Sequence, residues 1–243
     1  MKKIALIPAR YAATRFPYKL MQPLGDKTVI LQTYTNTKAT GLFDEVFVVT
    51  DHELIFNEIT SNGGKAIMSI GNHESGTDRI AEAIREMDAE VILNVQGDEP
   101  FVNKETLQKL LGAFEDPKIE VASVMKVFAD QTLVENTNYV KVVVDKNNHS
   151  LLFSRSVIPY YRDQTLSPVY YEHIGVYAFR KKALMQFTQW EMTPLEQIEK
   201  IECLRFLENG IPLKMILTEH TGVKIDVPED LAKAQEYLDK LNK

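Results

Sequence analysis

The sequence predicts an α/β fold with a mostly parallel central sheet, and three observations carry that prediction. In the first half of the chain, short β-branched runs alternate with helical patterns, as in a β-α-β series. One of these runs, residues 91–95, is apolar almost throughout, as is typical of a central strand of a parallel sheet. Beyond residue 120 the predicted strands follow one another with little helix between them, which indicates an added antiparallel portion.

The individual elements follow from local signals. In the first half, strands are predicted at 4–8, 46–50, 65–69 and 91–95, and helices at 29–39, 53–61, 78–87 and about 104–114. Thr28 and Asn103 are suitable helix N-caps, and Gly63 ends the second helix. In the second half, strands are predicted at 121–127, 140–144, 151–154, 174–179 and 213–217, with helices at 183–188, 194–208 and 229–241.

Composition excludes several classes of protein. The chain has 243 residues, of which 44% are hydrophobic and 26% charged, which suits one α/β domain or a large core with a smaller lobe. A formal net charge of −6 argues against a general nucleic-acid binder. No run approaches the roughly 20 apolar residues of a membrane span. The single cysteine, Cys203, fits a reducing cytoplasm, and the scattered histidines do not suggest zinc.

The first 25 residues contain no acidic side chain, although the whole protein is acidic. This segment carries Arg10, Arg15 and Lys19 in a loop that follows the first predicted strand. Guanidinium and ammonium groups make charge-assisted hydrogen bonds to phosphate, so the loop is predicted to hold a phosphate-like anion. It lacks the glycines of either common nucleotide-binding fingerprint, so side chains would have to do the holding. Lys2 and Lys3 fit a solvated basic N-terminus instead.

Three further polar segments lie at predicted strand ends or helix starts, where ligands bind in open parallel sheets. Residues 72–79 lead into a helix, and Ser75 suits either a ligand contact or a simple helix cap. Asp98 follows the apolar strand in a Gly-Asp turn, and Asp226 comes just before the last helix; both are candidate Mg²⁺ ligands. Glu229 and Asp230 are most simply favourable charges at a helix start.

Taken together, these segments resemble the 3-deoxy-manno-octulosonate (Kdo) cytidylyltransferases over nearly the whole chain. The matching stretches are IPARYAATRFPYK, TDH, HESGTDRIAEA, NVQGDEP, VKVV, FSRSVIPYYRD, HIGVYAFR, TPLEQIEKIECLR and DVPEDL. The resemblance implies a nucleotide-diphospho-sugar transferase (Rossmann-like) fold, as a single domain over residues 1–243. Residues 1–118 would form the nucleotide-binding half, and residues 119–243 the sugar-binding and dimerisation half.

The resemblance also implies an activity: Mg²⁺-dependent transfer of CMP from CTP to the anomeric hydroxyl of Kdo, with release of pyrophosphate. Such a protein would be a cytoplasmic homodimer that supplies an activated sugar for lipopolysaccharide, with no nucleic-acid or membrane partner. The implied catalytic residues are Arg10, Lys19, Asp98 and Asp226. The implied nucleotide-binding residues are Ala9, Arg10, Lys19, Ser75, Arg79 and Asp98, and the implied magnesium ligands are Asp98 and Asp226. Gln96, Arg155, Arg162, His173, Tyr177 and Glu202 would face the sugar acid.

Plainer interpretations of some of these residues remain open. Tyr177 occupies a position in the alternating pattern of a predicted strand that suits a core side chain. His173 can also be interpreted as an ordinary histidine at a strand end. Glu202 is predicted to lie in a helix whose Glu196 and Glu199 form a solvated face. Two other functions are also open: a glycosyltransferase that uses a nucleotide-sugar donor, and a non-catalytic sensor of CTP.

The chain departs from the family pattern at several positions. Tyr18 stands where the family usually has glycine, so the loop before Lys19 lacks glycine's freedom at positive φ. Cys203 replaces a glutamine whose amide could face the sugar. Val227 replaces a threonine helix cap, a change that typically costs about 1 kcal/mol of helix stability. Lys224 replaces a glycine and adds a cation beside the proposed metal ligand Asp226.

Overall fold

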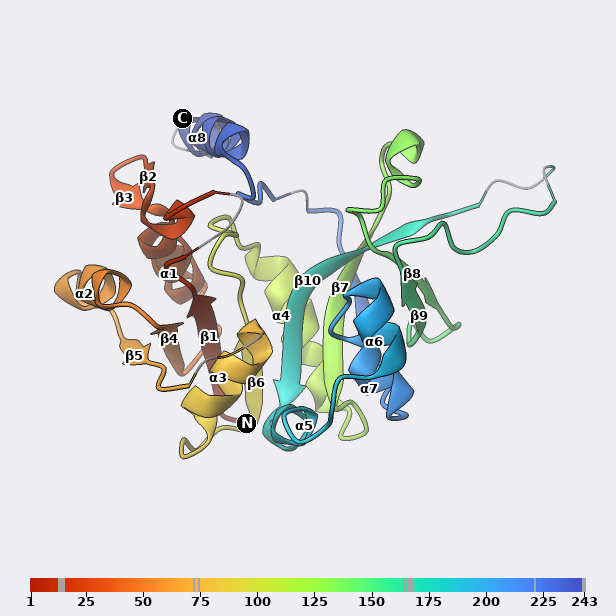
Figure 1. Ribbon diagram of the computed structural model, residues 1–243, viewed down its shortest axis with the longest axis horizontal. Helices are drawn as coiled ribbons and strands as arrows, with labels where there is room; N and C mark the ends of the chain where they lie inside the picture. The colour runs from red at the N-terminus through yellow and green to blue at the C-terminus, as the bar shows by residue number, and fades with distance from the viewer. Residues whose placement is uncertain are drawn as a thin grey trace. The chain divides into compact units, whose positions relative to one another are not determined.

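The computed structural model describes residues 1–12, 16–71, 73, 75–163, 165, 168–220 and 222–241. The chain divides into two compact units, each described here by itself (Figure 1). The first unit comprises Met1–Leu107 and Thr221–Lys243, and the second comprises Gln108–His220. These bounds differ from the predicted halves, because the C-terminal segment belongs with the N-terminal unit.

A parallel sheet organises the first unit, with its strands in the order β6, β1, β4, β5. The strands are β1 (Lys3–Ala9), β4 (Glu45–Thr50), β5 (Ala66–Met68) and β6 (Val91–Asn94). Leu6 and Ile7 are both fully buried, and since successive side chains of a strand point to opposite faces, both faces of β1 are covered. The register pairs Ala9 with Thr50 and Leu6 with Asn94, so the carboxyl ends of three strands meet at one edge.

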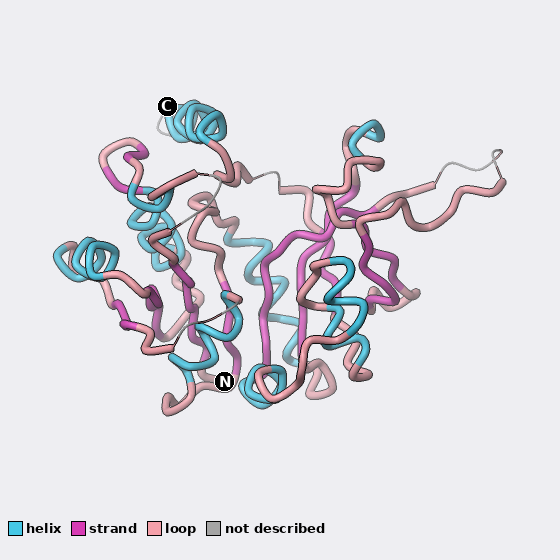
Figure 2. Tube along the Cα trace, viewed as in Figure 1, coloured by secondary structure: helices cyan, strands magenta, loops and turns pink. Residues whose placement is uncertain are grey.

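This unit also contains the helices α1 (Val29–Ala39), α2 (Glu53–Ser61), α3 (Gly76–Ile84) and α8 (Pro228–Leu241), with the short η1 (Lys19–Met21), β2 (Pro23–Leu24) and β3 (Lys27–Thr28) between β1 and α1. Helices α1, α2 and α3 pack against the parallel sheet, whereas α8 contacts β2, and the helix starts confirm several sequence signals (Figure 2). The hydroxyl of Thr28 caps α1 by accepting from the backbone of Leu31 at 3.2 Å, as predicted. Pro228 is the first residue of α8, also as predicted.

The boundary between the units falls within α4 (Lys104–Gly112), whose start is capped by Asn103. The second unit contains β7 (Val121–Val127), β8 (Lys141–Val144), β9 (Ser150–Ser154), β10 (Tyr171–Arg180), β11 (Lys214–Leu217), α5 (Lys181–Phe187), α6 (Pro194–Glu199) and α7 (Leu204–Glu208), with η2 (Ala113–Glu115) and η3 (Gln131–Leu133). Strand β7 pairs antiparallel with β10 and parallel with β11, and β8 pairs antiparallel with both β10 and β9. The expectation of a strand-rich second portion is therefore confirmed.

The predicted single helix over 194–208 is wrong. The structure has two helices, α6 and α7, separated by a turn in which Lys200 adopts a left-handed conformation with φ 54°. Glu196 on α6 is only 4% exposed and forms an ion pair of 2.6 Å with Arg205 on α7. A continuous helix would place residues nine positions apart about 13 Å apart along its axis, so the pair requires the chain to turn back. The predicted solvated face of Glu196 is wrong for the same reason.

Of the described helices, none has both the length and the apolar character that a membrane crossing requires.

Candidate active site

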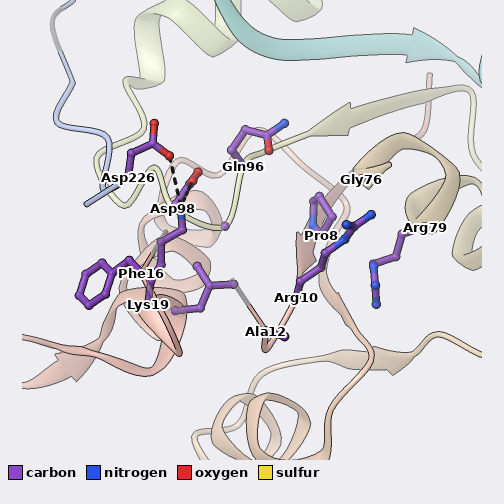
Figure 3. A pocket seen from close by; sticks show the side chains of 12 residues that line it. Pro8, Arg10, Ala12, Phe16, Lys19, Gly76, Arg79, Gln96, Asp98 and Asp226 are labelled. Carbon is purple, nitrogen blue, oxygen red and sulfur yellow. Dashed lines mark hydrogen bonds and ion pairs between the residues drawn. The ribbon is translucent and has the colours of Figure 1, made fainter. Parts of the chain in front are cut away.

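A pocket of about 350 Å³ lies within the first unit (Figure 3). Its lining comes from the segments that follow β1 and β6, from the start of α3, and from the segment before α8. The lining residues are Pro8, Arg10, Ala12, Phe16, Lys19, Leu20, Gly76, Arg79, Gln96, Gly97, Asp98 and Asp226. The volume is in the range of small-molecule sites, and its polar side chains include charged groups of both signs.

Lys19 lies between the two aspartates that the sequence singled out. Its ammonium nitrogen is 2.6 Å from Oδ2 of Asp98 and 3.3 Å from Oδ1 of Asp226, as the dashed lines in Figure 3 mark. The side chains of Lys19 and Asp98 are only 14% and 15% exposed, so bulk solvent screens this pair weakly. The predicted convergence of the three residues in one pocket is confirmed; their catalytic roles stay predictions.

The loop before Lys19 is built without glycine. Tyr18 adopts the left-handed conformation itself, with φ 56° and ψ 24°, and its carbonyl oxygen accepts from the backbone of Met21 at 2.9 Å. A left-handed conformation, which glycine adopts most readily, is therefore adopted here by a tyrosine. Arg15, which the sequence analysis grouped with Lys19, lies outside the described residues.

Close packing positions Asp98. A Cβ at the preceding Gly97 would lie 3.0 Å from the carbonyl oxygen of Pro8 and 3.3 Å from Ile30, so only glycine fits without a shift. The hydroxyl of Thr33 on α1 donates to the carbonyl oxygen of Gly97 at 2.9 Å. Helix α1 and β1 thus hold the turn that carries the carboxylate.

Asp230 positions Asp226. Its Oδ2 accepts hydrogen bonds from the backbone N–H groups of Asp226 at 3.1 Å and Val227 at 3.2 Å. Burial opposes ionisation here, but hydrogen bonds from Lys233 and from these N–H groups outweigh it and lower the pKa of Asp230. The carboxylate supplies a cap at the helix start where Val227 cannot, so Asp230 does more than interact with the helix dipole.

Arg10 and Lys224 bring two further positive charges to the site, Arg10 in the pocket lining and Lys224 beside Asp226. Arg10 donates to the carbonyl oxygen of His73 at 2.6 Å, and the ring of His73 lies 2.9 Å from Glu82. Lys224 lies 3.4 Å from Oδ2 of Asp226. Burial opposes its charge, but the nearby carboxylates, Asp98 and Asp226 first, outweigh burial and raise the pKa of Lys224.

Three of the residues predicted to bind the nucleotide, Ala9, Ser75 and Arg79, have structural roles in the first unit. Ser75 is the N-cap of α3 and accepts from the backbone of Asp78 at 3.1 Å, which confirms the cap interpretation. Arg79 lines the pocket, but its guanidinium also donates to Ser69 at 2.6 Å and to Asp51 at 2.8 Å. Ala9 is the fully buried last residue of β1. Asn72 and Glu74 of the same predicted segment lie outside the described residues.

Within the second unit, Arg155 holds the turn between α6 and α7. Its guanidinium donates to the carbonyl oxygens of Glu199 at 2.7 Å, Thr137 at 2.8 Å and Lys200 at 3.3 Å. Its backbone N–H donates to the Glu199 carboxylate at 2.9 Å. Bonds to the end of α6 satisfy carbonyl groups that the helix leaves unpaired. Arg162, the other arginine predicted to face the sugar acid, has an exposed side chain.

His173 is a core histidine. It lies on β10, and its Nε2 is 2.9 Å from the hydroxyl oxygen of Ser123. That hydroxyl also lies 3.2 Å from the carbonyl oxygen of Ile174 and 2.9 Å from that of Val176. Burial lowers the pKa of His173 from 6.5 to about 3, so the ring is neutral near pH 7.

The remaining predicted sugar contacts are spread over both units. Gln96 lines the pocket of the first unit, whereas Tyr177 lies on β10. Glu202 lies in the turn between α6 and α7, not within a helix as predicted. Cys203, which stands in place of the glutamine of the family pattern, is 1% exposed and so lies inside the second unit. Burial raises the pKa of its thiol. Whether these residues bind a sugar acid stays a prediction.

Sequence reasoning missed Asp51 and underrated Asp230. Asp51 directly follows β4 and connects two parts of the pocket wall, since it accepts from Arg79 and from the backbone of Tyr11 at 3.3 Å. Its position after a parallel strand was the available signal. Asp230 lies three residues after Val227, the spacing at which a side chain reaches back to the residue before a helix.

Comparison with known proteins gives a consistent result. A cytidylyltransferase family model matches residues 4–220. A 3-deoxy-manno-octulosonate cytidylyltransferase from Flavobacterium johnsoniae is 55% identical over 241 residues, which cover 98% of this chain and 99% of that protein. A protein of the same description from Christiangramia forsetii is 51% identical over 238 residues, with 97% and 96% covered.

A solved structure is also similar. It is a CMP:2-keto-3-deoxy-manno-octonic acid synthetase complexed with CTP, with a TM-score of 0.95 and 33% sequence identity. The match covers 99% of this chain and 100% of that one.

Proposed function

The chain belongs to the 3-deoxy-manno-octulosonate cytidylyltransferase family, and we propose that it transfers CMP from CTP to the anomeric hydroxyl of Kdo, releasing pyrophosphate. One observation assigns this reaction to particular residues: Lys19 contacts both Asp98 and Asp226 in a pocket that Arg10 also lines. That arrangement suits a phosphoryl group, which needs concentrated positive charge and a divalent cation.

Charge repulsion is the first obstacle, because a sugar acid must approach a triphosphate. Lys19 and Arg10 offset it by placing two cations where negative charge develops on the α-phosphate and the departing pyrophosphate. Phe16 and Leu20, which line the same pocket, limit its contact with water and so strengthen these interactions. Burial lowers the pKa of His173 to about 3, so its ring is too weak a base to suit general-base catalysis near pH 7.

Asp98 and Asp226 are the proposed magnesium ligands. Their carboxylates already share one cation, the Lys19 ammonium, so the pair suits a divalent ion. Among the described residues there is no group of three or more His, Cys, Asp or Glu side chains that suits a metal. Two carboxylates completed by water and phosphate oxygens are the ligands that Mg²⁺ prefers. When bound, the ion would polarise the α-phosphoryl group.

The test is pyrophosphate release with CTP, Mg²⁺ and Kdo, each omitted in turn. We expect release only with all three. Asp226→Asn should slow release by about a thousandfold at limiting magnesium, because charge stabilisation by a bound ion amounts to several kcal/mol. Glu229→Gln, a neighbouring exposed carboxylate on α8, is the matched control and should keep the wild-type rate. A normal rate for Asp226→Asn would contradict the assignment.

The same assay separates the rival functions. Tight CTP binding with no pyrophosphate release would favour a CTP sensor, and transfer from a nucleotide-sugar without release from CTP would favour a glycosyltransferase. The two carboxylates beside a cationic loop favour synthesis, since a sensor needs no polarised phosphoryl group. A panel of ulosonic acids, including Kdo and its 8-amino analogue, would identify the acceptor.

The biological setting is proposed with the reaction: a cytoplasmic homodimer that supplies CMP-Kdo for lipopolysaccharide. Exposed apolar side chains of the second unit support the homodimer, since Leu151 and Tyr160 are 62% and 86% exposed. Sedimentation equilibrium should give twice the chain mass, and a charged substitution such as Leu151→Glu should lower it.

A further inference from the structure

Three aromatic rings pack together beside the cationic loop of the first unit. The ring of Tyr11 lies face to face with His52, with centroids 3.7 Å apart and planes at 14°. The ring of Tyr18 lies 4.7 Å from Tyr11 at 42°. Tyr11 therefore contacts both other rings, and the three form one cluster.

The three rings come from three separate turns of the chain. Tyr11 follows Arg10 at the end of β1, and its N–H donates to Asp51 at 3.3 Å. His52 is the N-cap of α2, and its Nδ1 accepts from the backbone of Leu54 at 3.2 Å. Tyr18 directly precedes η1, whose first residue is Lys19. The cluster thus joins the residue after Arg10, the residue before Lys19 and the turn between β4 and α2.

Tyr18 holds a backbone conformation that tyrosine rarely adopts. A φ of 56° is unfavourable for any residue with a Cβ and persists only when surrounding contacts favour it. The contact between the rings of Tyr18 and Tyr11 is such an interaction. The ring contact therefore adds a restraint on this loop that a glycine in the same backbone conformation would lack.

We propose that Tyr11, Tyr18 and His52 are positioning residues that hold Arg10 and Lys19 in place for the triphosphate of CTP. The inference rests on the proposed function, because it assigns the role of a cluster that flanks the same pocket. A restrained pair of cations loses less freedom when the nucleotide binds, so the cluster should favour CTP binding. It has no such effect on the sugar acid.

The decisive variants remove a ring while keeping the backbone. Tyr18→Gly removes the ring and accepts a positive φ without strain, so it should not lower the melting temperature for backbone reasons. His52→Asn removes the outer ring but keeps an N-cap acceptor for Leu54. Tyr18→Phe keeps the ring and loses only the hydroxyl, and it serves as the conservative control. KM values for CTP and Kdo are measured for each, with calorimetric binding of CTP alone.

We expect Tyr18→Gly and His52→Asn to raise KM and Kd for CTP by about threefold to tenfold, the range of an aromatic pair, with a change in KM for Kdo below about twofold. Tyr18→Phe should match the wild type. Equal shifts in both KM values, or a lowered melting temperature with unchanged CTP binding, would overturn the positioning role. If the wild-type protein itself releases no pyrophosphate, the proposed function fails instead; CTP calorimetry still tests the cluster.

Discussion

The backbone N–H of Ile225 donates a hydrogen bond to the carbonyl oxygen of Asp98 at 3.0 Å. Ile225 is fully buried, so this bond is anchored by a side chain in the core of the first unit. It joins the turn after β6 to the segment before α8 and thereby sets the separation of Asp98 and Asp226. The two carboxylates are therefore positioned by main-chain contacts and not by their own side chains alone.

Asp230→Ala should slow pyrophosphate release by about tenfold, because it removes both hydrogen bonds that hold the backbone of Asp226 and Val227. Loss of the helix cap should also cost about 1 kcal/mol of unfolding free energy, measured by urea denaturation. Lys233→Ala, which removes only an exposed partner of Asp230, is the control and should leave the rate unchanged. A wild-type rate for Asp230→Ala, despite lower stability, would show that Asp226 needs no such support.

Lys224→Gly should lower the magnesium concentration that gives half-maximal activity by about twofold to fivefold, the range expected for an ion pair near the protein surface. The ammonium group of Lys224 lies 3.4 Å from Asp226 and competes with a divalent ion for that carboxylate. Binding of Mn²⁺, followed by electron paramagnetic resonance without turnover, should tighten in parallel. An unchanged Mn²⁺ affinity would indicate that Lys224 does not compete.

Arg155→Lys should lower the free energy of unfolding by about 2 kcal/mol, because an ammonium group cannot reproduce bonds to three separated carbonyl oxygens. The matched control is Arg162→Lys, at an exposed position of the same unit, which should keep wild-type stability. Thermal and urea denaturation measure both. Equal stability of the two variants would argue that Arg155 has no structural role.

His173 should make the protein less stable as the solution becomes acidic. Its pKa is about 3 when folded and near 6.5 when unfolded, so between these values the unfolded state binds more protons. Stability from this group is therefore intact above about pH 6.5 and is lost toward pH 3, by up to about 1.4 kcal/mol per pH unit.

Nuclear magnetic resonance checks the assignment directly. The ring signals of His173 should not shift between about pH 8 and about pH 5, where an ordinary histidine titrates. A titration midpoint near pH 6.5 in the folded protein would contradict the neutral, buried ring.

Local signals in the sequence predicted most of the fold. Alternation of apolar runs and helical patterns identified the parallel strands of the first unit, and Thr28 and Asn103 marked helix starts, because caps act on backbone groups within a few residues. The candidate site residues could also be found in the sequence, because ligands bind at the carboxyl ends of parallel strands. Cations after the first strand and aspartates near strand and helix ends marked Lys19, Asp98 and Asp226; the two aspartates lie 79 and 207 residues beyond Lys19 and meet it in the folded chain.

The tertiary structure decided what depends on partners far apart in the chain. The break between α6 and α7 follows from the buried pair of Glu196 with Arg205 and from Arg155 at the end of α6. The left-handed conformation of Tyr18 accompanies its contact with Tyr11. Periodicity and capping report only on neighbours in sequence, whereas a buried ion pair or a stacked ring gains its stabilisation when folding brings distant residues into contact and excludes water from them.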